Sequence, residues 1–468
     1  MNTFGRLVAT TAIGLSLAWP VGVVIATAPT VERMLDNGMK VIVRTDHRAP
    51  VAISQVWYRV GSSSEPNGYT GISHVLEHMM FKGTEAYPGG RFSEIIAANG
   101  GQENAFTSRD YTAYYQFLGS DRLEIAFKLE ADRMRNLALP ADEFARELEV
   151  VKEERLMRTD DEPTALAYEH FIATAYLNSP YQHPVIGWMT DLDHLEIDDL
   201  RHWYEHWYQP NNATLVVVGD VEPEAVFKLA ERYFGAIPAA DSIPALKPRI
   251  EVNQRGERRI RVKAPAKVPY LLVGYHVPVL NTVAPDLAWE PFALKVLAGV
   301  LGDGSSSRLT RELVRGAEIA SSADASYRVS GKYSGQFLLD ATPAAGQEIA
   351  ALEQSLYAQI ERVRTDRVPD AELNRIKAQV IASETYQLDS VQGQANQIGA
   401  LESVGLGWRL LDEYAARIKA ITAEQVREVA RKYLIEDNRT VAELVPVPID
   451  ESAPPQRPMK GNGRDRHG

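Results

Sequence analysis

The 468-residue chain contains no cysteine, so disulfide bonds and thiolate metal sites are excluded. Any metal ion must therefore be held by histidine and carboxylate side chains. Positive charge is also in short supply, because 50 Lys and Arg residues face 62 Asp and Glu residues, which gives a net charge of −12. This balance argues against a nucleic-acid-binding surface, and we expect no nucleic-acid partner.

Long apolar runs are confined to the N-terminus. Residues 7–28 form an uncharged run of 22 residues that follows Arg6 and ends with Ala26 and Ala28 in an A-x-A arrangement. This pattern predicts a secretory signal peptide over residues 1–28, and therefore an exported, periplasmic protein. The run is also just long enough to span a bilayer, so the alternative is an uncleaved N-terminal anchor.

Histidine is scarce, with 10 in the chain, yet two lie four residues apart in the apolar stretch GISHVLEHMMFKGT (71–84). On a helix, His74, Glu77 and His78 share one face. Two histidines at i and i+4 are good zinc ligands, and H-x-x-E-H is the inverted zincin motif. Such a short string also arises by chance, and a catalytic zinc site uses three protein ligands, so a third ligand is required.

The candidate segment for that ligand is DEFARELEVVKEERLMR (142–158), which we expect to be helical. Its positions at i, i+3, i+4 and i+7 form a half-apolar face that should point inward: Glu147, Val150, Val151 and Glu154. Lys152, Glu153 and Arg155 fall elsewhere and should be solvated. The alternative is that all of these acids are surface charges on a solvated helix.

The order of strand and helix patterns predicts two similar α/β domains. Residues 197–221 resemble residues 423–447, because Asn212 matches Asn438 at the same offset that brings Thr214 onto Thr440. We assign the first, zinc-binding catalytic domain to residues 29–243, a linker to 244–262, the homologous second domain to 263–449 and a disordered tail to 450–468.

Together, the motif and the acidic helix resemble the pitrilysin/insulinase-type inverted-zincin metallopeptidases, which include mitochondrial processing peptidase and its bacterial relatives. In that family a glutamate within an E-x(6)-E pair follows H-x-x-E-H at the distance seen here. In this chain 75 residues separate His78 from Glu154, and Glu147 stands seven residues before Glu154. The resemblance covers nearly the whole chain after residue 28, including the stretches DNGMKVIVRTDHRAPVA, NAFTSRDYTAYY and YQPNNATLVVVGDV.

The resemblance implies a role for each residue of the motif. His74, His78 and Glu154 would bind Zn²⁺ and leave a fourth position for water, while Glu77 would act as the general base. Glu147 would orient a ligand or the metal site from outside the ligand set. The implied activity is that of a zinc-dependent endopeptidase that hydrolyses peptides or unfolded polypeptide segments.

The resemblance also implies an α+β fold in which two similar domains, each a mostly antiparallel sheet with helices packed on it, enclose a substrate chamber. In the family an N-A-x-T strand pairs with an extended peptide substrate, and here the matching residues are Asn104, Ala105, Phe106 and Thr107. From propensity alone, this segment is equally an aromatic-rich core strand.

A partner subunit is implied by what the second half lacks. In the family, the C-terminal domain of an active unit supplies an arginine and, seven residues later, a tyrosine. Here Val314 and Ser321 occupy these positions, while Arg315 and Tyr327 have the wrong spacing. We therefore expect a heterodimer with a homologous, zinc-less subunit that carries the Arg/Tyr pair, with a homodimer as the alternative. A non-catalytic scaffold or assembly subunit is the other function, but such members have a degraded motif, whereas here every element stands.

Overall fold

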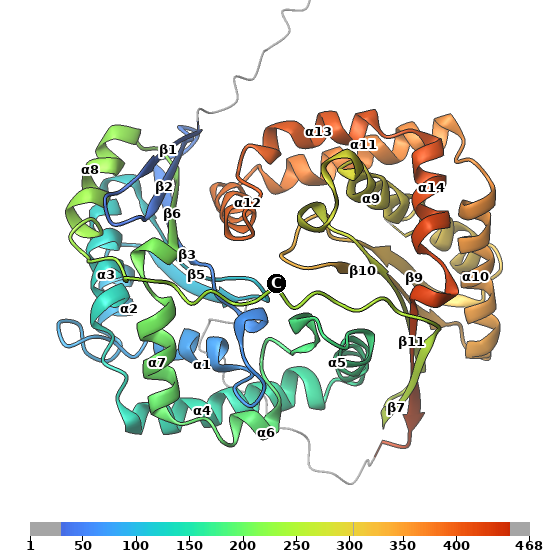
Figure 1. Ribbon diagram of the computed structural model, residues 1–468, viewed down its shortest axis with the longest axis horizontal. Helices are drawn as coiled ribbons and strands as arrows, with labels where there is room; N and C mark the ends of the chain where they lie inside the picture. The colour runs from blue at the N-terminus through green and yellow to red at the C-terminus, as the bar shows by residue number, and fades with distance from the viewer. Residues whose placement is uncertain (1–29, 303, 450–468) are drawn as a thin grey trace, which may run out of the picture.

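The computed structural model describes residues 30–302 and 304–449, so the predicted export segment and the predicted tail lie outside the described residues. Two β-sheets, each with helices packed on it, lie beside each other, one built from the first half of the chain and one from the second (Figure 1). The predicted α+β fold with two similar lobes is confirmed.

The first sheet has six strands in the order β1-β2-β6-β3-β5-β4. β2 and β6 are parallel, and the other neighbours are antiparallel. The central strand β6 (ATLVVVG) is buried along its whole length, as its continuous apolar sequence predicts, whereas β4 lies at the edge. The strands are β1 (Thr30–Met34), β2 (Lys40–Thr45), β3 (Val51–Tyr58), β4 (Gln102–Thr107), β5 (Thr112–Gly119) and β6 (Ala213–Gly219).

The second sheet has five strands in the order β7-β11-β8-β10-β9, which repeats the first sheet without its β1. Again one pair, β7 with β11, is parallel and the others are antiparallel. The strand β7 begins at Arg258, within the segment assigned to the linker. The strands are β7 (Arg258–Pro265), β8 (Tyr270–Val277), β9 (Ala320–Ser326), β10 (Gly335–Pro343) and β11 (Arg439–Val447).

The two halves share local geometry as well as strand order. The Asn212 side chain donates to the Trp207 carbonyl at 2.9 Å, and the matching Asn438 side chain donates to the Tyr433 carbonyl at 3.2 Å. In both cases the hydrogen bond links the end of a helix to the residues just before the next strand. Thr214 and Thr440 then pair with the first residue of the parallel neighbour in their own sheets. The sequence repeat is thus matched by a structural repeat.

Eight helices are described in the first half of the chain. Among them α1 lies against α4, α7 and β4, and α3 packs on α8 and β3, so that these helices cover one face of the first sheet (Figure 1). Their bounds are α1 (Ile72–Met79), α2 (Arg91–Ala98), α3 (Leu123–Asn136), α4 (Ala141–Arg155), α5 (Pro163–Ala175), α6 (Met189–Leu192), α7 (Ile197–Trp207) and α8 (Pro223–Tyr233).

In the second half α9 is almost wholly buried, and it packs against α11, α13, α14 and β9. Here too the helices of this half, with the exception of α12, cover one face of the sheet (Figure 1). The described helices of this half are α9 (Glu290–Leu301), α10 (Ile349–Thr365), α11 (Asp370–Gln387), α12 (Val391–Ser403), α13 (Leu410–Ala420) and α14 (Ala423–Tyr433).

The other face of each sheet is covered by a helix from the opposite half. Helix α5, from the first half, packs on β7 and β11, while α12, from the second half, packs on β3 and β6 (Figure 1). The second contact is so close that a Cβ on Gly399 would lie 2.0 Å from the Trp57 ring. This exchange of helices holds the two halves together and places α5 beside the first-half residues described next.

Candidate metal centre

The helix α1, which carries the H-x-x-E-H motif, begins at a tightly built turn. Gly71 has a φ of 88°, and a Cβ there would lie 2.6 Å from the Ile186 carbonyl oxygen, so only glycine fits. The buried Glu65 carboxylate accepts hydrogen bonds from the backbone N–H groups of Gly71 (2.8 Å) and Ser73 (2.9 Å). Burial raises the pKa of Glu65 to about 7, although these backbone donors act in the opposite direction.

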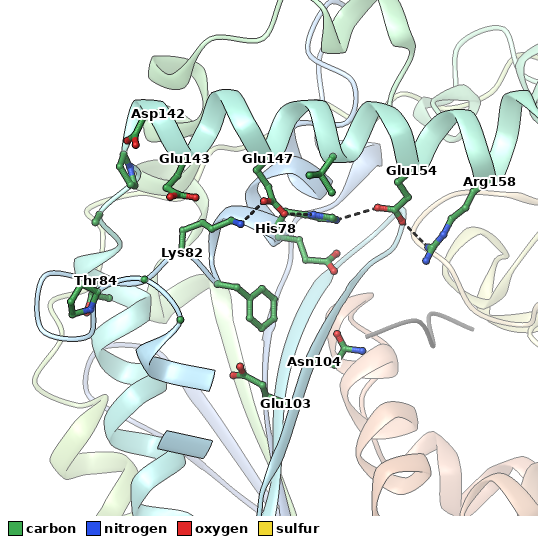
Figure 2. Close-up of a pocket in the computed structure, with 18 of the residues that line it drawn as sticks. His78, Lys82, Thr84, Glu103, Asn104, Asp142, Glu143, Glu147, Glu154 and Arg158 are labelled. Atoms are coloured by element: carbon green, nitrogen blue, oxygen red, sulfur yellow. Dashed lines mark hydrogen bonds and ion pairs between the residues drawn. The ribbon is translucent and has the colours of Figure 1, made fainter. Parts of the chain in front are cut away.

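The helix α4 lies across α1 and brings the two predicted glutamates to the motif. Both Glu147 and Glu154 point from α4 toward the cavity below it, as Figure 2 shows. The regular helix ends at Arg155, and the predicted last turn is instead a π-helical turn, Leu156–Asp160. Arg155 was expected to be solvated, and this prediction is wrong. Its side chain is buried and donates to Glu169 and to the Gly187 carbonyl.

In the part of the chain that the structure describes, one group of three side chains has the placement of a metal site: His74, His78 and Glu154. Their ligand atoms all lie within 4.8 Å of one another. The Glu154 Oε2 atom is 3.3 Å from His78 Nε2 and 3.9 Å from His74 Nε2. A tetrahedral zinc ion with bonds of about 2.0–2.1 Å spaces its ligands about 3.3 Å apart, so this donor set fits zinc after a small contraction.

Charged neighbours hold the proposed ligands from outside (Figure 2). His78 Nδ1 donates to Glu147 Oε1 at 2.9 Å, because a carboxylate only accepts, and this leaves Nε2 directed toward Glu154. The second oxygen of Glu147 pairs with Lys82, and Arg158 pairs with Glu154 Oε1 at 2.7 Å. Both cations escaped the sequence analysis. Arg158 stands four residues after Glu154, a spacing that could have identified it, whereas Lys82 reaches Glu147 from a distant part of the sequence.

These charges set the protonation of the site. Burial lowers the pKa of His78, but the carboxylates of Glu147 and Glu154 raise it to about 9. Burial works to raise the pKa of Glu154, yet the hydrogen bond from His78 and the charges of His74 and Arg158 hold it at about 2. The Glu154 carboxylate therefore remains ionised at neutral pH, which suits a cation ligand.

Glu77 is buried beside the three proposed ligands but does not belong to their group. Its Oε2 atom accepts a hydrogen bond of 2.6 Å from the Thr107 hydroxyl. Glu77 lines two cavities, one of about 940 Å³ and one of about 340 Å³, which we call the first and second cavities. The carboxylate thus lies where two cavities meet, next to the proposed ligands.

Residues of the strand β4 line both cavities. Asn104 lines the first cavity, and Phe106 and Thr107 line the second, whereas the Ala105 side chain is buried in the core. β4 pairs with β5 on one side only, so its other edge has no strand partner in the described sheet. Of the four predicted substrate-binding residues, Ala105 is thus limited to backbone contacts.

Val314 and Ser321, at the positions of the family's arginine and tyrosine, both make contacts within the second half. Val314 ends a π-helical turn and packs against the core, and the Ser321 hydroxyl donates to the Thr342 carbonyl at 3.3 Å. The Tyr327 phenol is buried and donates to the Pro278 carbonyl at 2.6 Å.

Among the described residues, no helix is long and apolar enough to cross a membrane.

Comparison with known proteins agrees with this geometry. Residues 40–188 match the model of the family described as insulinase (peptidase family M16), and residues 194–380 match the model described as the peptidase M16 inactive domain. The chain is 32% identical to the zinc protease PqqE of Helicobacter pylori, over 88% of this chain and 92% of that protein. It is 26% identical to the mitochondrial-processing peptidase subunit beta of Lentinula edodes, over 86% of each.

A solved structure, that of a protease from Helicobacter pylori, superposes with a TM-score of 0.84 and 31% sequence identity, covering 90% of this chain and all of that one. The two family models together span well over half of the chain, and they meet between residues 188 and 194. The protein therefore belongs to the M16 family of zinc-dependent peptidases, with the insulinase-type match in its first half and the inactive-domain match in its second.

Proposed function

We propose that this chain is a zinc-dependent endopeptidase that cleaves peptides or unfolded polypeptide segments, and that it is the catalytic subunit of a heterodimer. The observation that carries the proposal is the meeting of His74, His78 and Glu154 within 4.8 Å of one another, next to the buried Glu77. A scaffold subunit has no need of this arrangement.

Each residue has a distinct task in this proposal. When bound, zinc supplies Lewis-acid chemistry, because it lowers the pKa of water to about 7 and polarises a peptide carbonyl. Glu77 accepts the proton of the attacking water and passes it to the leaving amine. The Thr107 hydroxyl fixes one oxygen of Glu77, and Glu147 fixes the orientation of the His78 ring.

The substrate is proposed to bind as an additional strand along the edge of β4. Strand addition reads mainly the peptide backbone, so it accepts varied sequences. Asn104 and Thr107 lie on the two sides of Glu77, in the first and second cavities. A peptide that follows this edge therefore brings one of its bonds to Glu77 and the metal ligands.

The partner is proposed to supply what Val314 and Ser321 lack. Neither side chain can donate a charge or a phenol to the developing oxyanion, which an arginine and a tyrosine stabilise in active family units. A homologous, zinc-less chain with that pair would complete the site, and a homodimer is the alternative. The N-terminal sequence supports export to the periplasm, with a cleaved signal peptide or an uncleaved anchor.

The proposal is tested by metal content and hydrolysis measured on the same samples. The wild-type chain should hold one zinc per chain and cleave peptides from a mixed library, with a faster rate when the homologous subunit is added. His78→Ala should lose both properties after dialysis. His202→Ala, a change to an exposed histidine on α7, is the matched control and should keep both. A fully metal-loaded wild type that cleaves no peptide, with or without the partner, would identify a scaffold.

A further inference from the structure

Arg109 is a partly buried cation that has no negatively charged partner among the described residues. It follows β4 in the turn to β5. Within the described residues its side chain makes one long hydrogen bond, from Nη2 to the Tyr168 hydroxyl at 3.5 Å, and one cation–π contact, with the Tyr181 ring, whose centroid lies 5.4 Å away. Its Nε atom is buried and makes no hydrogen bond. Burying a guanidinium without a full set of hydrogen bonds costs free energy, and an anion that the described residues do not provide would offset this cost.

The position of Arg109 connects it to the proposed reaction. It lines the second cavity together with His74 and Glu77, and it also lines a third cavity of about 730 Å³ between the two halves of the chain. Along β4 and the following turn, Asn104 belongs to the first cavity and Arg109 to the second and third. A peptide that follows β4 therefore reaches Arg109 after it passes Glu77.

Of the three carboxylates that line the second cavity, two are paired with arginines, and the third, Glu77, accepts a hydrogen bond from the Thr107 hydroxyl. Glu169 accepts two hydrogen bonds of 2.8 Å from Arg155, and Glu154 pairs with Arg158. When a divalent metal binds, Glu154 also helps to neutralise the ion, so the cavity gains positive charge. Its walls include apolar side chains that suit the methylene groups of a long side chain: Phe106, Ile172, Val185 and Ile186.

We propose that Arg109 is the specificity-determining residue of an acidic subsite, in which the second cavity binds the carboxylate of an Asp or Glu side chain of the substrate. That side chain lies across the cleaved bond from the residue bound in the first cavity. This inference rests on the proposed peptidase function. The planar guanidinium offers parallel N–H donors to a carboxylate, and their bonds are strong where water is largely excluded.

The test uses the zinc-loaded full protein with any subunit that co-purifies from its natural host. A set of peptides with one core sequence carries a single Glu moved through every position, and each has a matched Gln peptide. The quantity measured is the ratio of kcat/KM for each Glu peptide to that for its Gln partner. The wild type should show a ratio of roughly tenfold to hundredfold at one or two adjacent positions on one side of the cleaved bond.

Arg109→Gln should bring that ratio to near one, and Arg109→Lys, which keeps the charge but not the fork, should leave an intermediate ratio. Arg122→Gln, a change to an exposed arginine outside the cavities, should leave the ratio as in the wild type. The inference is overturned if no position favours Glu, or if the preference survives in Arg109→Gln.

A second measurement separates this inference from the peptidase proposal. Fluorescent Glu and Gln peptides are titrated onto the Glu77→Gln protein, and binding is followed by anisotropy. Tighter binding of the Glu peptide by roughly tenfold, lost when Arg109→Gln is added, supports the acidic subsite even if the wild type hydrolyses nothing. Equal affinities for the two peptides overturn the subsite whether or not the wild type is active.

Discussion

Replacing Glu147 by glutamine should weaken zinc binding although no proposed ligand is removed. Glu147 accepts a hydrogen bond from His78 Nδ1 at 2.9 Å, and its second oxygen pairs with Lys82. Glutamine keeps the shape of the side chain but loses its charge. The change therefore lowers the basicity of the His78 ring and leaves the Lys82 ammonium without its carboxylate.

The expected loss follows from these two contacts. Removing the outer partner of a metal-binding histidine typically costs 10- to 100-fold in metal affinity, or about 1.4–2.7 kcal/mol. The glutamine oxygen still accepts from His78, so the expected loss lies near tenfold. Lys82→Met should also lower the zinc affinity, but by less than Glu147→Gln. The double variant should lose less than the sum of the two, with a coupling of about 0.5–1 kcal/mol, because both changes act on one carboxylate.

The assay is a zinc dissociation constant measured by competition with a fluorescent chelator at neutral pH. Glu143→Gln is the matched control, because Glu143 lies on the same helix and lines the same cavity but pairs with Arg146. Equal zinc affinities of the Glu147→Gln and Glu143→Gln proteins would refute the reasoning. Strict additivity of the Lys82 and Glu147 changes would refute the shared contact.

Three further outcomes are expected. Glu77→Gln should keep one zinc per chain while hydrolysis falls by roughly 10²–10⁴-fold or more, and near-normal turnover in a metal-analysed sample would rule Glu77 out as the base. Burial raises the pKa of Glu65 from 4.5 to about 7, so its stabilising contribution is complete below pH 4.5 and is lost as pH rises through 7. The free energy of unfolding of the wild type minus that of Glu65→Gln should therefore fall by about 2.5 kcal/mol between about pH 5 and about pH 8 in denaturant titrations, and a difference that does not change with pH contradicts this. Gly399→Ala should lower the melting temperature, with a loss of about 1–3 kcal/mol, because its methyl group meets Trp57, whereas Gly90→Ala, in open space, should have little effect; equal melting temperatures would count against a close packing of α12.

The helix α4 shows which features helical periodicity can predict and which it cannot. Its spacing distinguished Glu147 and Glu154 from their acidic neighbours, and both lie at the cavity beside α1. The same reasoning failed for Arg155, which was expected in solvent but is buried against Glu169 on α5. It was also incomplete for Val150, which is 40% exposed and lines the first cavity. A periodic pattern describes one helix, and it carries no information about a partner on another helix.

The sequence also could not reveal which sheet a helix covers. The repeat of Asn212 and Asn438 predicted two similar halves, and the strand order of the two sheets agrees with it. An amphipathic helix must bury its apolar face, but many sheets satisfy that need equally well. The packing of α5 and α12 on the opposite sheets, and with it the placement of Tyr168 beside Arg109, depends on contacts between residues far apart in the chain.

The exchange of α5 and α12 has a consequence for how far each half of the chain can stand alone. The two helices occupy equivalent places in the order of the two repeats, and each covers the sheet of the other repeat. This is the arrangement of a domain-swapped dimer whose two protomers have been joined end to end. A fragment cut between α8 and β7 would expose the apolar side of its own exchanged helix and one bare face of its own sheet. Each fragment therefore lacks the helix that covers its sheet in the intact chain, and we expect each half to depend on the other for its stability.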